Sequence, residues 1–235
     1  GDWSSDVCSS DLFELDESLS IGTSLFVSRR TRDFIDNQRV FYSNLTNQWE
    51  WTNLYSEEAS WGTLGILGVQ YMPDRKLSLG LTVKHAVDFL AQAEQQHITA
   101  TQNGTEYSTG TFNLLDLGYK SVPTSVTAGA AYFFSPYLLW SSDLTWYPEH
   151  NANNIQFKRK QIMNFATSME YYMSLNFPIR FGFYTNNSTL SQIYHGAYDV
   201  DMMGVTFALG YETEFSTLSF GVDYSWGNGK IGIND

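Results

Sequence analysis

Strict alternation of apolar with small or polar residues is the feature of this sequence that most limits its fold. In residues 76–89, KLSLGLTVKHAVDF, leucines, valines and a phenylalanine alternate with Ser, Gly, Thr, Lys, Ala and Asp. Successive side chains of a strand point to opposite faces, so this segment predicts a strand with one apolar face. The same pattern recurs in SLSIGTSLFV, LLWSSDLTWY, NFATSMEYYMSL and LSFGVDYSW. No segment has helical spacing over three turns, and we expect an all-β chain.

The alternation predicts nine strands, whose connections differ in length. The strands are expected near residues 18–32, 59–72, 76–90, 122–134, 137–147, 156–175, 178–187, 199–212 and 215–227. Tight turns are expected in MPDRK, FSPY, LNFP and ETEFS, and long connections at 33–58, 91–121, 148–155 and 188–198. Short connections at one end and long ones at the other are typical of an antiparallel transmembrane β-barrel with periplasmic turns and extracellular loops.

Composition favours the barrel over a soluble β-sandwich, which is the alternative reading of the alternation. The chain contains 15 Tyr, 16 Phe and 7 Trp, many near the predicted strand ends, where aromatic rings form belts at membrane interfaces. No apolar run approaches the roughly 18 residues of a membrane helix, which excludes a helical membrane protein. A sandwich would place charges on the second face of each strand, whereas here that face is mostly Ser, Gly, Thr and Ala.

The first twelve residues, GDWSSDVCSSDL, do not fit this pattern. Residues 2–12 match letter for letter the translation of a common short-read sequencing adapter. We therefore interpret residues 1–12 as an artefact that is not native, and expect it to form neither helix nor strand. Without it the chain has no cysteine, because Cys8 is the only one, and the formal charge changes from −12 to −9. No disulfide or cysteine chemistry is then predicted.

The sequence offers little support for other chemistry. Its 13 Lys and Arg are scattered, which argues against a nucleic-acid partner. The four histidines lack ligand spacing, so neither a metal site nor a cofactor is predicted: His85, His97, His150 and His195. No serine is paired in sequence with a histidine and an acid, and we predict no catalytic residue and no enzyme. A pairing in space stays open.

Four segments, in their order and spacing, resemble a known family. They are MPDRKLSLGLTVKHAVDF, VPTSVTAGAAYFFSPYLLWSSDLTWY, FPIRFGFYTNN and VTFALGYETEFSTLSFGVDYSW. Over about residues 59–227 they look like the C-terminal part of the FadL/TodX family of outer-membrane transporters for long-chain fatty acids and hydrocarbons. The resemblance implies a fourteen-stranded barrel of the bacterial outer membrane that is plugged by an N-terminal hatch and is a monomer when full length. Its partners would be a hydrophobic small-molecule ligand and outer-membrane lipid.

Nine is an odd number of strands, and the chain stops at GNGKIGIND. Since single-chain bacterial barrels have even strand numbers, we expect residues 13–235 to be a partial barrel domain that lacks the hatch and the closing strand. The nine strands would be the fifth to the thirteenth of the family.

The resemblance makes residues 33–58 and 91–121 the third and fourth extracellular loops, which in the family form a groove that captures ligand. These loops carry many apolar side chains, and the expected groove residues are Phe41, Tyr42, Trp49, Trp51, Leu54, Phe112, Leu114, Leu115 and Leu117. The alternative is that these side chains only pack the loops against one another.

The charged residues expected to face the lumen are Asp88, Asp143, Glu170, Arg180, Glu212 and Asp223. The function that this reading predicts is passive transport of long-chain fatty acids or other hydrophobic small molecules. The alternatives are a barrel without a transport role, such as an adhesin or porin-like protein, and a membrane-embedded hydrolase.

Overall fold

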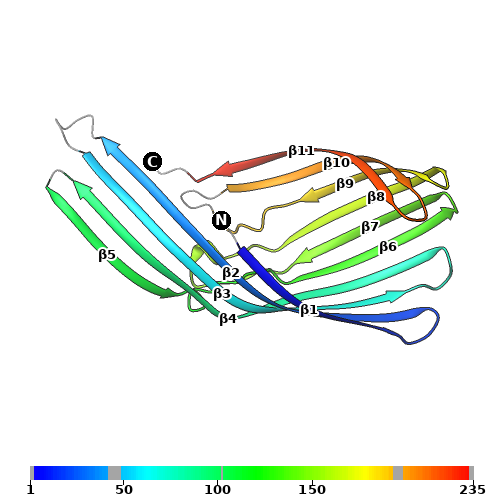
Figure 1. Cartoon of the computed structure of the whole chain (residues 1–235), viewed down its shortest axis with the longest axis horizontal. Coiled ribbons are helices and arrows are strands. Elements are labelled where there is room, and N and C mark those ends of the chain that lie inside the picture. The colour runs from blue at the N-terminus through cyan, green and yellow to red at the C-terminus, as the bar shows by residue number, and fades with distance from the viewer. Residues whose placement is uncertain (1–2, 42–48, 102, 193–197, 233–235) are drawn as a thin grey trace. The chain divides into compact units, whose positions relative to one another are not determined.

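The computed structural model describes residues 3–41, 49–101, 103–192 and 198–232, and within these ranges it contains eleven strands and one short 3-10 helix (Figure 1). The elements are β1 (Trp3–Glu14), β2 (Leu19–Phe41), β3 (Trp49–Tyr71), β4 (Leu77–Thr101), β5 (Gly104–Asn113), β6 (Ser125–Ser135), β7 (Leu138–Tyr147), η1 (Ile155–Phe157), β8 (Ile162–Ser174), β9 (Phe177–Asn186), β10 (Tyr198–Glu212) and β11 (Thr217–Ile231).

The strands form one sheet in the order β1-β2-β3-β4-β6-β7-β8-β9-β10-β11, and β5 pairs with β4. The pairs of defined register are antiparallel. One strand serves two partners, because β4 pairs with β6 through residues 77–84 and with β5 through 92–101. The predicted all-β antiparallel class is confirmed, and each of the nine predicted strands is present.

The chain divides into two compact units. The first unit comprises residues 1–9, 25–64 and 86–122, and the second comprises residues 10–24, 65–85 and 123–235. Strands β2, β3 and β4 therefore contribute one part to each unit, whereas β5 lies in the first unit and β6–β11 lie in the second.

Two predictions of irregular structure are wrong. The segments 33–58 and 91–121 are largely strand, because β2 continues to Phe41, β3 begins at Trp49, β4 continues to Thr101 and β5 follows. Charges interrupt the apolar alternation there, but the backbone N–H and C=O groups still need partners, and pairing between neighbouring strands supplies them. Residues 1–12 were expected to form neither helix nor strand, but residues 3–12 belong to β1, which lies beside β2. An unpaired strand edge offers backbone groups to any adjacent segment.

The predicted tight turns are confirmed, and aspartates hold two of the short connections. Asp74 accepts hydrogen bonds from the amides of Lys76 (2.7 Å) and Leu77 (2.9 Å). Asp16 accepts in the same way from the amides of Ser18 and Leu19, and the Ser18 hydroxyl and amide hold the pKa of Asp16 below its ordinary value. These turns lie with those of β6–β7, β8–β9 and β10–β11 at one end of the second unit (Figure 1). An Asx turn closes a hairpin with few residues because the side chain replaces a backbone acceptor.

The described residues bury very little apolar surface. The buried apolar side chains are Ala86, Ala91, Ala93, Leu114, Ala152 and Ile162, mostly small, and Pro178 is also fully enclosed. Large apolar side chains are instead exposed along most strands. No helix in the part of the chain that the structure describes is long and apolar enough to span a membrane. A sheet whose large apolar side chains are exposed, and not packed in a core, is expected to face an apolar environment.

Candidate functional site

The second unit has one face of large apolar side chains and one of small or polar ones. Across β10 and β11, Leu209 lies opposite Phe220 and Phe207 opposite Val222, whereas the intervening Ala208 lies opposite Gly221. Phe220 is 70% exposed. We call these the apolar face and the small-polar face. Period-two alternation over β6–β11 assigns the other residues in the same way.

Aromatic rings gather on the apolar face. The ring centroids of Phe181 and Phe207 are 4.9 Å apart, as are those of Phe177 and Tyr211 near the short turns. Tilted ring pairs at these distances add modest packing energy between neighbouring strands. The apolar face thus carries contacting rings from β9 and β10.

The small-polar face carries the predicted charges of this unit. The Arg180 guanidinium donates to Glu170 on β8 and, over 2.9 Å, to Glu212 on β10, so that it joins three strands. Asp223 accepts a hydrogen bond of 3.2 Å from the Tyr184 hydroxyl. Four of the five predicted charges on this face, Glu170, Arg180, Glu212 and Asp223, thus have a specific partner on another strand.

Glycines and other small residues leave a hollow of about 400 Å³ on this face. Its lining comes mainly from five strands: Leu12, Ser20, Gly22, Gly68, Val69, Gln70, Ser78, Gly80, Thr82, Gly129, Ala130, Ala131, Ser141 and Asp143. A Cβ at Gly129 would meet the Asp143 carboxylate, so the glycine makes room for that predicted charge. The lining combines hydroxyls and a carboxylate with small apolar groups, and its large apolar side chains are Leu12 and Val69.

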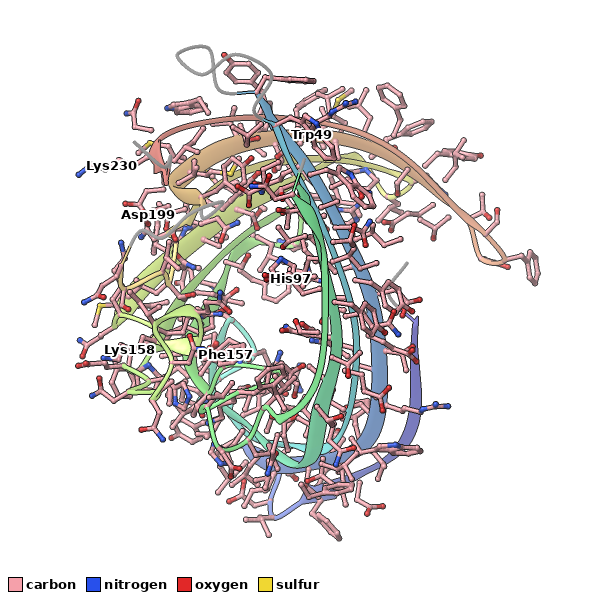
Figure 2. The ribbon with its side chains drawn as sticks, turned by 90° about the vertical axis from the view of Figure 1, so that its left-hand side faces the viewer. Trp49, His97, Phe157, Lys158, Asp199 and Lys230 are labelled. Atoms are coloured by element: carbon pink, nitrogen blue, oxygen red, sulfur yellow. The ribbon has the colours of Figure 1, made fainter. Side chains whose placement is uncertain are left out.

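An ion pair and a backbone hydrogen bond join the long connections at the other end of the second unit. The Lys160 ammonium lies 3.3 Å from Asp199 near the start of β10, and the Lys160 amide donates to Thr189. Figure 2 shows Asp199 beside Lys230, its register partner on β11. The Ser188 side chain and then Lys160 lower the pKa of Asp199 from its ordinary value. The connection that contains η1 is therefore tied to β10 partly by charge.

In the first unit, residues 114–121 follow β5 and are hydrogen-bonded to strands β2 and β4. We call this segment the strap. The Leu114 amide donates to Ala91 (2.8 Å), and the Ser121 amide donates to the Asp88 carboxylate (2.9 Å). Arg30 donates to the Ser121 carbonyl over 3.2 Å. Three predicted groove residues, Leu114, Leu115 and Leu117, thus lie in the strap. Asp88, predicted as a lumen charge, is a hydrogen-bond partner of the strap.

The other predicted groove residues fall into two separate hollows of the first unit. Leu54 and Phe112 line a hollow of about 410 Å³ with Asp36, Gln38, Thr52, Gln95, His97, Ser108, Thr109 and Gly110. Trp49 and Trp51 line another of about 460 Å³ with Asn37, Gln38, Arg39 and Ala100. Trp49 and Trp51 alternate with Thr52 and Leu54 along β3, so these two pairs of side chains lie on opposite faces of that strand, while Gln38 lines both hollows.

Phe41 is 67% exposed and lies at the end of β2, and Tyr42 lies outside the described residues. The structure therefore does not bring the predicted residues into one groove. Figure 2 places Trp49 at an end of β3 and His97 well along β4.

Sequence reasoning missed the basic residues that organise this unit. The Arg39 guanidinium lies over the rings of Phe41 (4.7 Å) and Trp49 (5.9 Å), and Arg29 lies 5.7 Å from the Trp61 ring. The pKa of Tyr55 is raised, first by burial and then by the negative charges of Asp33 and Glu57. The spacing of Arg39 and Phe41, two positions apart on one face of a strand, could have indicated such a contact. It was missed because residues 33–58 were predicted to be a loop.

No cluster that could hold a metal occurs among the residues that the structure describes. His85 hydrogen-bonds Thr124, His97 lines a hollow and His150 bridges to Arg159, while His195 lies outside the described residues. The histidines are thus used separately.

Comparisons with known proteins identify the fold. No protein-family model matches the chain, and no curated protein matches it. Among solved structures, the CymD monoaromatic hydrocarbon channel superposes with a TM-score of 0.66 at 14% identity, over 93% of this chain and 67% of that one. A Pseudomonas aeruginosa FadL homologue gives 0.64 at 11%, over 97% and 60%, and the Pseudomonas putida toluene transporter TodX gives 0.59 at 12%, over 95% and 66%. The chain spans 60–67% of the length of these structures. The predicted resemblance is confirmed at the level of the fold.

Proposed function

We propose that this chain, whose fold is that of the FadL-like channels, belongs to a β-barrel of the bacterial outer membrane that passes hydrophobic small molecules passively. The observation that carries the proposal is the division of the second unit into an exposed apolar face and a small-polar face lined with glycines and paired charges. In a closed barrel the first would contact lipid and the second would line the lumen. No chemical step is part of this function.

Residues 13–235 would then be part of a longer barrel, and residues 1–12 would be foreign to it. A sheet with free edges on β1 and β11 has unpaired backbone groups that lipid cannot satisfy, so a lipid-embedded protein must close it. We use "full protein" for the product of the complete reading frame that contains residues 13–235, which we expect to be a monomer.

Ligand capture is proposed in the hollow that contains Leu54 and Phe112. On β3, Leu54 has the same parity as Ser60, whose hydroxyl contacts Tyr119 of the strap at 3.4 Å. This hollow and the strap therefore share one face, from which a ligand could continue inward, whereas the tryptophans lie on the other face. An alkyl chain gains about 0.8 kcal/mol per buried methylene, so a shallow hollow can hold it weakly and release it.

Uptake by vesicles that contain the full protein tests the proposal. A fluorescent long-chain fatty acid and a neutral aromatic hydrocarbon are each presented outside, with a protein-free vesicle and a vesicle containing an unrelated small barrel as controls. We expect uptake of at least one compound above both controls. Entry no faster than in the controls, from a protein whose folding is verified by heat-modifiable gel mobility, would contradict the transport role.

A further inference from the structure

The strap in the first unit lies against strands β2, β3 and β4, where the enclosed side chains are mostly small. The residues beneath and beside it are among the most enclosed of the described chain: Ala86 (3% exposed), Ala91 (1%), Ala93 (1%), Ser56 (3%) and Ser60 (5%). A sheet face lined by alanine and serine cannot bury itself, so the strap is what fills the space above it.

Leu114 is the only large apolar side chain that the strap buries among the described residues. It is 6% exposed, whereas Leu115 and Leu117 are partly exposed. Within the strap, the amides of Leu117 and Tyr119 donate to the Leu114 carbonyl, and the amide of Gly118 donates to Leu115. The segment is thus a compact turn with one apolar anchor at its beginning.

The far end of the strap is held by polar groups from three strands. Asp88 of β4 accepts from the Ser121 amide, Arg30 of β2 donates to the Ser121 carbonyl, and Ser60 of β3 lies within hydrogen-bond distance of Tyr119. Both backbone groups of Ser121 are therefore held by side chains, not by a strand ladder. Such contacts can be exchanged with water at modest cost, unlike backbone ladders or a packed core.

We infer that the strap is a movable cover, latched by Asp88 and Arg30 at Ser121, whose release opens to solutes the face of the first unit that carries Ala86, Ser60 and Asp88. The role of the opening in solute passage rests on the proposed transport function, whereas the hydrogen bonds that hold the strap do not depend on it. When the strap leaves, the uncovered face carries the small side chains of Ala86, Ala91 and Ser60 beside Asp88 and Arg30, so the movement makes room for a solute. Asp88, predicted from the sequence as a lumen charge, is on this view a positioning residue for the strap.

The latch is tested by the accessibility of Leu114. Residues 13–235 contain no cysteine, so Leu114→Cys adds a single thiol to this part of the full protein. That thiol is buried while the strap is closed, so a membrane-impermeant maleimide should react slowly. Asp88→Ala should raise the labelling rate about tenfold or more, because the hydrogen bond to a charged acceptor is lost. Asp88→Asn keeps an acceptor oxygen and should restore slow labelling. The matched control is Glu214→Ala, which removes an exposed carboxylate in the short turn between β10 and β11 of the second unit.

Uptake measured on the same variants without Leu114→Cys completes the test. Faster labelling with faster uptake in Asp88→Ala alone supports the inference. Equal labelling in Asp88→Ala and the parent overturns the latch, and faster labelling with unchanged uptake overturns the role of the strap as a cover of the path. If the parent protein itself takes up nothing, the proposed function fails, and the labelling rates still decide whether Asp88 holds the strap.

Discussion

The two units use similar strands in different ways. In the second unit every strand from β6 to β11 keeps large apolar residues on one face and small or polar ones on the other. In the first unit both faces carry polar groups: Arg39 and Asn37 share a face with Trp49, and Asp36 shares one with Leu54. Contact with lipid sorts residues strictly, because a charge in hydrocarbon costs several kcal/mol.

If the proposed function holds, the difference indicates where lipid contact ends. A membrane strand needs only about 9–11 residues, whereas β2, β3 and β4 have 23, 23 and 25. The excess lies in the first unit, where the exposed Val87 and Phe89 give way along β4 to Gln92, Glu94 and Gln95. The residues of β2, β3 and β4 outside the lipid would then be available to line hollows and to contact the strap.

The largest expected effect comes from placing a charge on the apolar face. Val222→Lys should destabilise the full protein in lipid by about 2–4 kcal/mol, because the lysine would face hydrocarbon near mid-depth. The lower stability should appear as a lower urea midpoint of unfolding from vesicles. Ser225→Lys on the opposite face of β11 is the first control, and Trp51→Lys in the first unit is the second. If Trp51→Lys costs as much as Val222→Lys, the first unit also contacts lipid and the comparison is wrong.

A smaller effect is expected from the arginine that joins three strands. Arg180→Ala leaves the Glu170 and Glu212 carboxylates facing each other without a cation. Arg180 is about one-third exposed, and after allowance for solvent screening the cost should be about 1–2 kcal/mol in the same urea assay. Arg39→Ala, which removes only exposed cation–π contacts in the first unit, should cost less than 1 kcal/mol. Equal losses of stability would show that the Arg39 contacts stabilise the protein as much as the Arg180 ion pairs do.

Much of the second unit could be predicted from the sequence because its alternation is physically enforced at every position. Leu79 and Phe220, or Glu170 and Asp223, could be assigned to faces from parity alone. The strap could not be found in this way. Its contacts join Ser121 to Arg30 and Asp88, 91 and 33 residues away, and no local pattern records such pairings. The hollows were missed because charged strands such as residues 33–41 were read as loops.

The two hollows can be separated by ligand binding. Leu54→Ala with Phe112→Ala should weaken binding of a fluorescent fatty acid to the full protein about tenfold, since two apolar walls of the hollow are removed. Trp49→Ala with Trp51→Ala should leave the affinity nearly unchanged, because these rings lie on the other face of β3. Heat-modifiable mobility checks that both variants fold. The reverse ranking would move the capture site to the tryptophan hollow and separate it from the strap.

The smallest expected effect is a local response to acid at the long-connection end of the second unit. The pKa of Asp199 is lowered in the fold, so its contribution is present above the unfolded value of about 3.9 and is lost as the pH falls through the folded pKa. The connection around η1 should stay docked at neutral pH and loosen only below about pH 4. The protection factor of the Lys160 amide, which donates to Thr189, reports this docking by hydrogen exchange. Asp199→Asn should give the loosened value at every pH, whereas Asp16→Asn, in the short turn between β1 and β2, should leave it unchanged. A Lys160 protection factor that is the same at pH 3 and pH 7 in the parent protein would show that Thr189 and the bridge between His150 and Arg159 hold the connection without the charge.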